Sequence, residues 1–221
     1  MTVSTMLSLL SEGFVTSLLI FALTLLFSMP LGLAVMFGRR SRLTPLRGFI
    51  KAYISIMRGT PLMLQLMVVF YGPKLLLGVT VPGNWRFTAV IVAFVINYAA
   101  YFAEIYRGGI ESIPRGQYEA AQVLGYTKAQ TFFKIILPQM VKRVIPAVTN
   151  EVITLVKDTS LSRIIALQEI IWAGQAFLKG TQGISGAIWP LFFTGIYYLI
   201  FSGLLTLALG KLEKKLDYFK A

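Results

Sequence analysis

Two long runs without a charged residue decide what this chain can fold into. They cover residues 13–38 and 180–210. A helix needs about 20 apolar residues to cross a bilayer, and soluble helices rarely run this long without a charge. Only 14% of the 221 residues are charged and 56% are hydrophobic, whereas a soluble domain usually carries about 25% charge. The sequence therefore predicts an all-α polytopic protein of the cell membrane.

The residue types present exclude several kinds of site. The sequence has no cysteine and no histidine, which excludes disulfides, thiol nucleophiles and the usual zinc ligands. It also lacks a G-x-S-x-G motif and a G-x-x-x-x-G-K-[ST] phosphate-binding loop. Its first basic residue, Arg39, follows the first apolar run, whereas a secretory signal begins with basic residues. We therefore expect a retained first helix, no enzymatic activity and no cofactor bound by this chain.

The basic residues are placed asymmetrically. A formal net charge of +12 could indicate nucleic-acid binding, but most basic residues fall in alternate segments between apolar stretches, which is the positive-inside pattern. We therefore expect an outer N-terminus and a cytoplasmic C-terminus. The remaining candidate loops hold only Lys74, Arg86 and Lys179, and Lys157 and Arg163 lie near a span. The predicted inner residues are Arg39, Arg40, Arg42, Arg47, Lys51, Arg58, Arg107, Arg115, Lys128, Lys134, Lys142, Arg143, Lys211, Lys214, Lys215 and Lys220.

Hydropathy and turn residues predict five spans within a single domain, 1–221. A cytoplasmic helix around 46–58 leads into the second span, and Pro146 is expected to unwind the polar fourth span. Five spans are few for a complete transporter, and many transporters pair two similar halves, so we expect a dimer. The predicted spans are 13–37, 60–78, 87–106, 144–171 and 187–210, with outer loops at 79–86 and 172–186.

The inner loop 107–143 carries the most specific pattern. We expect two short helices, 116–124 and 128–136, joined through Gly125 and bounded by Pro114 and Pro138. The loop reads GQYEAAQVLGYTKAQTFFKIILPQM. By spacing alone it could be an ordinary helix-turn-helix surface loop. It resembles, however, the EAA signature of permease subunits of ABC importers, which forms a coupling helix on a cytoplasmic ATPase. The resemblance assigns this role to Glu119, Ala120, Ala121, Gly125 and Tyr126.

Three further stretches narrow the resemblance. MRGTPLMLQL (Met57 to Leu66), NYAAYFAEIYRGGIESI (Asn97 to Ile113) and NEVITLVKDTSL (Asn150 to Leu161) are similar to hallmarks of the polar amino acid permeases, the histidine/glutamine/arginine permease-like family. The resemblance implies a type I ABC importer fold and three kinds of partner. These are a dimeric ATP-binding subunit that binds ATP and Mg, a second permease subunit that is a copy or a related chain, and an extracytoplasmic amino acid-binding protein.

A few polar residues in apolar surroundings are candidates for the solute path. Ionisable groups at membrane depth usually face a cavity or a partner, and a spacing of seven places Glu151 and Asp158 on one helical face. A structural alternative pairs Asp158 with Lys157 or Arg163, and Glu104 with Arg107. We expect Thr60 to cap the helix that begins at Pro61. The candidate substrate-binding set is Gln65, Asn97, Glu104, Glu151, Thr154, Asp158 and Thr159, with Tyr71, Tyr98 and Tyr101 as possible neighbours.

Glu151 bears on the charge of the solute. A carboxylate at this position favours a cationic amino acid such as arginine, lysine or histidine, while cystine or a glutamine-like neutral amino acid stays as an alternative. A different class of function is an ion-coupled secondary carrier that uses Glu104, Glu151 or Asp158 as its proton site. The docking loop argues against that class, because a carrier powered by an ion gradient needs no ATPase.

Overall fold

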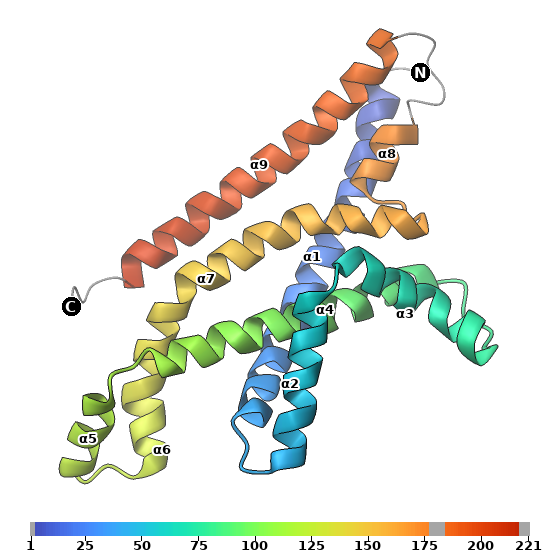
Figure 1. The fold of residues 1–221 in the computed structure, drawn as a ribbon. Coiled ribbons are helices and arrows are strands. Elements are labelled where there is room, and N and C mark those ends of the chain that lie inside the picture. The colour runs from blue at the N-terminus through green and yellow to red at the C-terminus, as the bar shows by residue number, and fades with distance from the viewer. Residues whose placement is uncertain (1–2, 177–183, 217–221) are drawn as a thin grey trace.

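The computed structural model describes residues 3–176 and 184–216 (Figure 1). All regular elements in these two ranges are helical, which confirms the predicted fold class. Lys179, Asp217, Lys220 and part of the predicted outer loop 172–186 lie outside the described residues. The elements are α1 (Val3–Arg39), α2 (Thr44–Gly59), α3 (Leu62–Leu77), α4 (Trp85–Glu111), α5 (Arg115–Val123), α6 (Lys128–Gln130), a π-helix (Thr131–Ile136), α7 (Leu137–Asp158), a 3₁₀-helix (Thr159–Ile165), α8 (Ile170–Ala176) and α9 (Ile184–Leu216).

The long apolar helices are fewer than predicted. By length and composition α1, α4 and α9 can each cross a membrane, and α2 with α3, bent by 110° at their junction, can form a fourth span. The predicted fourth span, 144–171, is not among these helices. Its helical part, α7, carries Lys142, Glu151 and Asp158 among other polar residues, which lowers its hydropathy below that of a lipid-facing helix.

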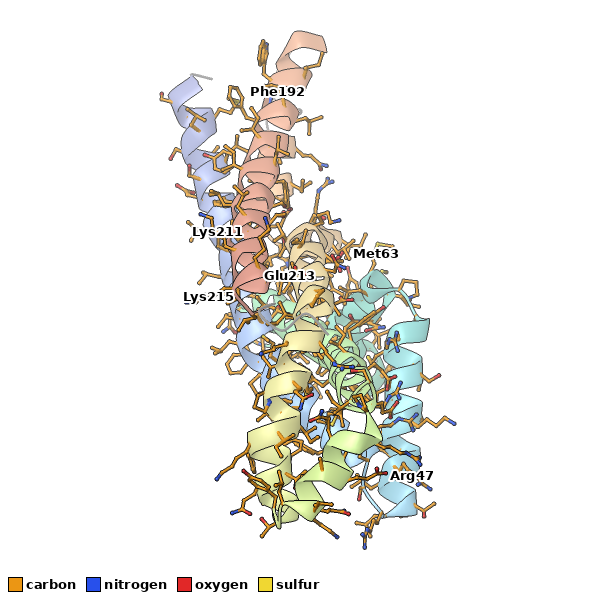
Figure 2. All side chains as sticks on the ribbon, turned by 90° about the vertical axis from the view of Figure 1, so that its left-hand side faces the viewer. Arg47, Met63, Phe192, Lys211, Glu213 and Lys215 are labelled. Atoms are coloured by element: carbon orange, nitrogen blue, oxygen red, sulfur yellow. The ribbon has the colours of Figure 1, made fainter. Side chains whose placement is uncertain are left out.

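Helix α4 forms the centre of the fold. Over its most apolar 18-residue window 56% of the residues are buried, against 6% for α9. Phe94, Ala99, Phe102 and Ala103 of α4 are buried, and α1, α2, α3 and α7 pack around the helix. Figure 2 shows α9 standing apart from this centre, with Phe192 on its upper half and Lys211, Glu213 and Lys215 at its lower end. An apolar helix this exposed indicates contact with lipid or with another subunit.

Gly32 permits the close crossing of α1 and α4. A β-carbon at this position would lie 2.7 Å from the Cβ of Phe102 and 3.1 Å from the backbone oxygen of Ala99. Small residues at helix crossings are typical of membrane proteins because they let backbones approach.

We expect Gly32→Val to destabilise the fold by about 1–3 kcal/mol, the usual cost of overpacking a close-packed interior. Thermal unfolding of the purified protein in detergent measures the effect. Gly203→Ala in α9 is the control, because its β-carbon would meet no atom within 4 Å. Equal unfolding midpoints for the two variants would contradict a close α1–α4 contact at Gly32.

The prolines of the α7 region act differently from the prediction. Helical structure continues through Pro138 and Pro146 into Asp158, so neither the boundary expected at Pro138 nor the unwinding expected at Pro146 occurs. Pro138 stands in the first turn of α7, where a missing N–H costs little. The preceding turn is a π-helix, in which the N–H of Leu137 donates to the oxygen of Phe132. The break comes later, at the 3₁₀-helix and the left-handed Ala166 (φ 58°).

Candidate functional site

The inner loop is a defined helix–turn–helix. Helix α5 ends at Val123, and Gly125 follows with a left-handed φ of +75°, as predicted. The N–H of Tyr126 donates to the oxygen of Ala121 at 3.0 Å, which closes the turn. Thr127 and Gln130 then form a reciprocal capping box that starts α6. The first helix, α5, matches the predicted 116–124 closely. The second begins at Lys128 as predicted, but it does not end at 136, because α6 and the π-helix continue directly into α7.

The tip of this loop exposes apolar side chains. Val123 is 88% exposed and Leu124 is 72% exposed, while Ala121 is buried against the loop's own second helix. Glu119 and Ala120 are exposed beside them. Figure 1 shows α5 and α6 together at one end of the molecule, beyond the ends of α4 and α7. Exposed apolar residues on a well-ordered polar loop indicate a protein-binding surface.

Hydrogen bonds tie the loop to the long helices on either side. Arg143 of α7 donates to the backbone oxygen of Ser112, directly after α4. Gln139 of α7 donates to Gln117 of α5 at 3.1 Å. A displacement of the loop tip would therefore be transmitted to α4 and α7, because no flexible linker separates the loop from these helices.

Glu104 lies at the centre of a cluster of arginines. Its carboxylate accepts from Arg107, with 2.8 Å between Oε2 and Nη2, and lies 3.7 Å from Arg58 and 4.0 Å from Arg39. The pairing with Arg107 is the structural alternative that the sequence offered. The sequence did not predict Arg39 and Arg58 as partners of Glu104. Both were predicted to lie on the inner side, which was the one signal for them. The cluster joins the ends of α1 and α2 to α4.

Glu151 and Asp158 lie on α7 next to Tyr98 of α4. The hydroxyl of Tyr98 donates to Oδ2 of Asp158 at 2.7 Å. Both carboxylates are partly buried, and no ion pair to either is present among the described residues. Thr154 is exposed between them, whereas the buried hydroxyl of Thr159 donates to the oxygen of Val156. The structural alternative, a pair of Asp158 with Lys157 or Arg163, is not formed within 4.0 Å.

Gln65 and Asn97 stabilise the bend between α2 and α3. Asn97 donates to Oε1 of Gln65 at 2.9 Å and to the backbone oxygen of Met57 at 3.1 Å. Gln65 in turn donates to the hydroxyl of Thr60 at 2.8 Å. Thr60 therefore ends α2 and supports the bend; it is not the cap of α3, which begins after Pro61. These amides already have partners within the fold, which favours a structural role over contact with a solute.

The polar residues thus fall into three groups. The carboxylates of Glu151 and Asp158, with Thr154 and Tyr98, form one; the ring of Tyr98 lies 6.3 Å from that of Tyr101. Glu104 belongs to the arginine cluster, where Arg58 also stacks 5.4 Å from Tyr101. Gln65 and Asn97 belong to the bend. Of the three groups, only the first offers carboxylates that form no ion pair within 4.0 Å among the described residues; Arg58 acts on Glu151 from a longer distance.

The whole chain is similar to several known proteins. The family model described as binding-protein-dependent transport system inner membrane component matches residues 28–218. The L-cystine transport system permease protein TcyB of Bacillus subtilis (strain 168) is 35% identical over 96% of this chain and 88% of its own length. The arginine transport system permease protein ArtQ of the same organism is 34% identical over 93% and 91%. A solved amino acid ABC transporter with histidines matches 97% of this chain and 100% of its own at a TM-score of 0.87 and 28% identity.

Proposed function

We propose a substrate class and a mode of energy coupling for this chain, which belongs to the family of binding-protein-dependent transport system inner membrane components. It is a permease subunit of an amino acid ABC importer with the fold of type I importer permeases. Permeases of this family act in the membrane beside a separate ATPase and a substrate-binding protein. Which amino acid is carried, and how the loop engages the ATPase, form the proposal.

The substrate of the proposal is a polar amino acid with a cationic side chain. The observation that carries it is the carboxylate pair of Glu151 and Asp158 on one face of α7, partly buried and without an ion pair within 4.0 Å in the described part of the chain. An unpaired carboxylate at membrane depth is costly unless a cation or a polar cavity compensates it. Asp158, positioned by Tyr98, suits the α-ammonium group, and Glu151, two turns away, suits a cationic side chain.

The names of the relatives support a polar amino acid as the substrate, and they leave an alternative for its charge. TcyB is named for cystine and ArtQ for arginine, and the similar solved transporter contains histidines. Cystine carries two ammonium groups, so a carboxylate pair would also suit it at both ends. A glutamine-like solute would need only one carboxylate. Arginine, lysine or histidine is therefore our proposed substrate, and cystine or a neutral polar amino acid is the alternative.

In the proposed coupling, the loop that contains Glu119, Ala120, Ala121, Gly125 and Tyr126 seats in the ATPase. The exposed Val123 and Leu124 would supply the apolar contact, and Glu119 a polar one at its edge. Closure of the ATPase dimer would then move α4 and α7 through the hydrogen bonds at Ser112 and Gln117, and the site would open in turn to each side. A second permease subunit, an outer N-terminus and a cytoplasmic C-terminus complete the proposal.

An ion-coupled secondary carrier is the competing class. Glu104, which could have served as a proton site, is engaged by arginines, so only Glu151 and Asp158 would serve. Uptake into proteoliposomes distinguishes the two classes. We expect uptake to require ATP, the ATPase and the binding protein; uptake driven by a proton gradient without the ATPase would overturn the proposed function.

Glu151→Gln tests the substrate charge. The variant keeps the shape of the side chain and removes its negative charge, so we expect the affinity for arginine to fall by about 10- to 100-fold, the value of one charge-assisted contact. The affinity for glutamine should change by less than about 3-fold, since a neutral side chain makes no ionic contact. Competition uptake by the reconstituted complex measures both.

Glu213→Gln is the matched control for this substitution. Glu213 lies at the C-terminal end of α9 (Figure 2) and not on α7, which carries the carboxylate pair, and its neutralisation should leave both affinities unchanged. If Glu151→Gln leaves a preference for cationic amino acids intact, the role proposed for Glu151 is wrong. A fall in cystine uptake with unchanged arginine uptake would instead favour the alternative substrate.

A further inference from the structure

A cavity of about 440 Å³ lies between the end of α1 and the inner loop. Phe37, Ile110 and Phe132 supply apolar walls, and Gln122, Arg40 and Lys128 lie among its polar lining residues. The rings of Phe37 and Phe132 are 6.2 Å apart, so the cavity forms where α1 contacts the π-helix. Its volume is within the range of about 300–1,000 Å³ that is usual for sites of small ligands.

The charge of the lining is one-sided. Arg40 and Lys128 are both cationic, and none of the lining residues is acidic. Neither residue forms an ion pair with a carboxylate within the part of the chain that the structure describes. Two unpaired cations that face one cavity attract an anion, and an arginine and a lysine together are a common donor set for phosphate.

The position of the cavity along α1 indicates how deep in the bilayer the cavity lies. The uncharged run of α1 ends at Gly38, and Arg39 and Arg40 follow at once. Phe37, 54% exposed at the end of this run, is an aromatic residue at the expected level of the headgroups. The basic residues beside it lie on the predicted cytoplasmic side, where the lipid surface is anionic. At this depth the apolar walls would adjoin the acyl region, and Arg40, with Lys128 across the cavity, would lie near the phosphates.

We propose that this cavity binds one anionic phospholipid. Its phosphate would contact Arg40 and Lys128, and the first part of an acyl chain would pack against Phe37, Ile110 and Phe132. The lipid would connect the end of α1 to the loop that carries Leu124, and so would support the loop from the membrane side. This site is separate from the carboxylate pair of the proposed solute path, and it does not depend on the identity of the transported amino acid. It shares Tyr126 with the proposed coupling loop, but neither Val123 nor Leu124 of the exposed tip lines it.

Native mass spectrometry of the whole transporter complex tests the proposal. The complex is exchanged into detergent with phosphatidylglycerol or with phosphatidylcholine, and the lipid retained per permease subunit is measured. We expect selective retention of phosphatidylglycerol. The double variant Arg40→Gln/Lys128→Gln should weaken retention by at least about 10-fold, because two charge-assisted contacts to the phosphate are lost.

A second basic pair provides the matched control. Arg47 and Lys51 are exposed on α2, on the same predicted inner side, and do not line the cavity (Figure 2 labels Arg47 at the lower end of α2). Arg47→Gln/Lys51→Gln removes the same charge and should keep retention within about 2-fold of the unchanged complex. Equal losses in the two double variants would overturn the site, since attraction would then be general to the basic surface.

Two further arms separate the lipid from other sources of phosphate. Added glycerol phosphate, which has the same headgroup chemistry without acyl chains, should not displace phosphatidylglycerol at concentrations up to about 100-fold higher, because it lacks the apolar contact. Displacement at equal concentration would indicate a site for a free phosphate ester and would overturn the lipid proposal. Phe132→Ser, which removes part of the apolar wall, should weaken lipid retention and leave that of glycerol phosphate unchanged. The lipid proposal would also be overturned if phosphatidylcholine were retained as well as phosphatidylglycerol.

Discussion

Leu124→Asp is expected to abolish ATP-driven uptake while the permease still folds. Leu124 is 72% exposed at the tip of the inner loop, so an aspartate there meets water in the isolated subunit and costs the fold little. In the proposed complex the same position lies against the ATPase. An unpaired charge buried in that contact would cost about 2–5 kcal/mol, which lowers the association constant by about 30- to 4,000-fold.

Two measurements separate loss of docking from loss of folding. Co-purification of the ATPase with tagged permease reports docking, and the unfolding midpoint of the permease alone reports the fold. We expect the first to be lost and the second to stay within about 2 °C of the original, as is usual for surface substitutions. Leu43→Asp is the control, because Leu43 is a leucine of similar exposure (64%) in the other inner turn, between α1 and α2. Full coupling in Leu124→Asp would place the ATPase elsewhere.

The two longest uncharged runs predicted the helices α1 and α9 well, whereas the predicted fourth span was wrong. Residues 13–38 fall within α1, and the described part of 180–210 falls within α9. A helix satisfies every backbone hydrogen bond within the segment itself, so a long apolar run in a bilayer is expected to be helical. The loop was predictable for a local reason, because Gly125 and the Thr127–Gln130 capping box act over four or five residues. The spacing of Glu151 and Asp158 likewise follows from helical periodicity alone.

Contacts between distant segments could not be read from the sequence. The hydrogen bonds of Asn97 with Gln65 and with the oxygen of Met57 exist because α4 crosses the bend of α2 and α3. Asn97 and Gln65 therefore resembled path residues when each was considered alone. Pro146 was expected to break α7, but packing of α7 against α4 and α9 outweighs the loss of one backbone hydrogen bond. A polar side chain in a membrane helix indicates that a hydrogen-bond or ionic partner exists, and the fold is needed to identify that partner.

Glu104→Gln is expected to be the most destabilising single substitution in the arginine cluster. The carboxylate is 16% exposed and neutralises Arg107, Arg58 and Arg39 at 2.8, 3.7 and 4.0 Å. A neutral amide leaves three positive charges close together where α1, α2 and α4 meet. Loss of one member of a partly buried, hydrogen-bonded charge pair costs about 2–5 kcal/mol, so we expect the unfolding midpoint to drop by several degrees.

The neighbouring Glu111 provides the control for Glu104. Among the described residues its one ion pair is with Arg107, and it is 53% exposed, so Glu111→Gln should cost no more than about 1 kcal/mol, as exposed ion pairs do. Arg58→Gln added to Glu104→Gln should recover part of the lost stability, because it removes one of the charges left unneutralised. Such non-additivity identifies charge imbalance rather than lost packing as the cause. If the two losses simply add, or if Glu104→Gln behaves like Glu111→Gln, then α1, α2 and α4 are joined by apolar packing and the cluster contributes little.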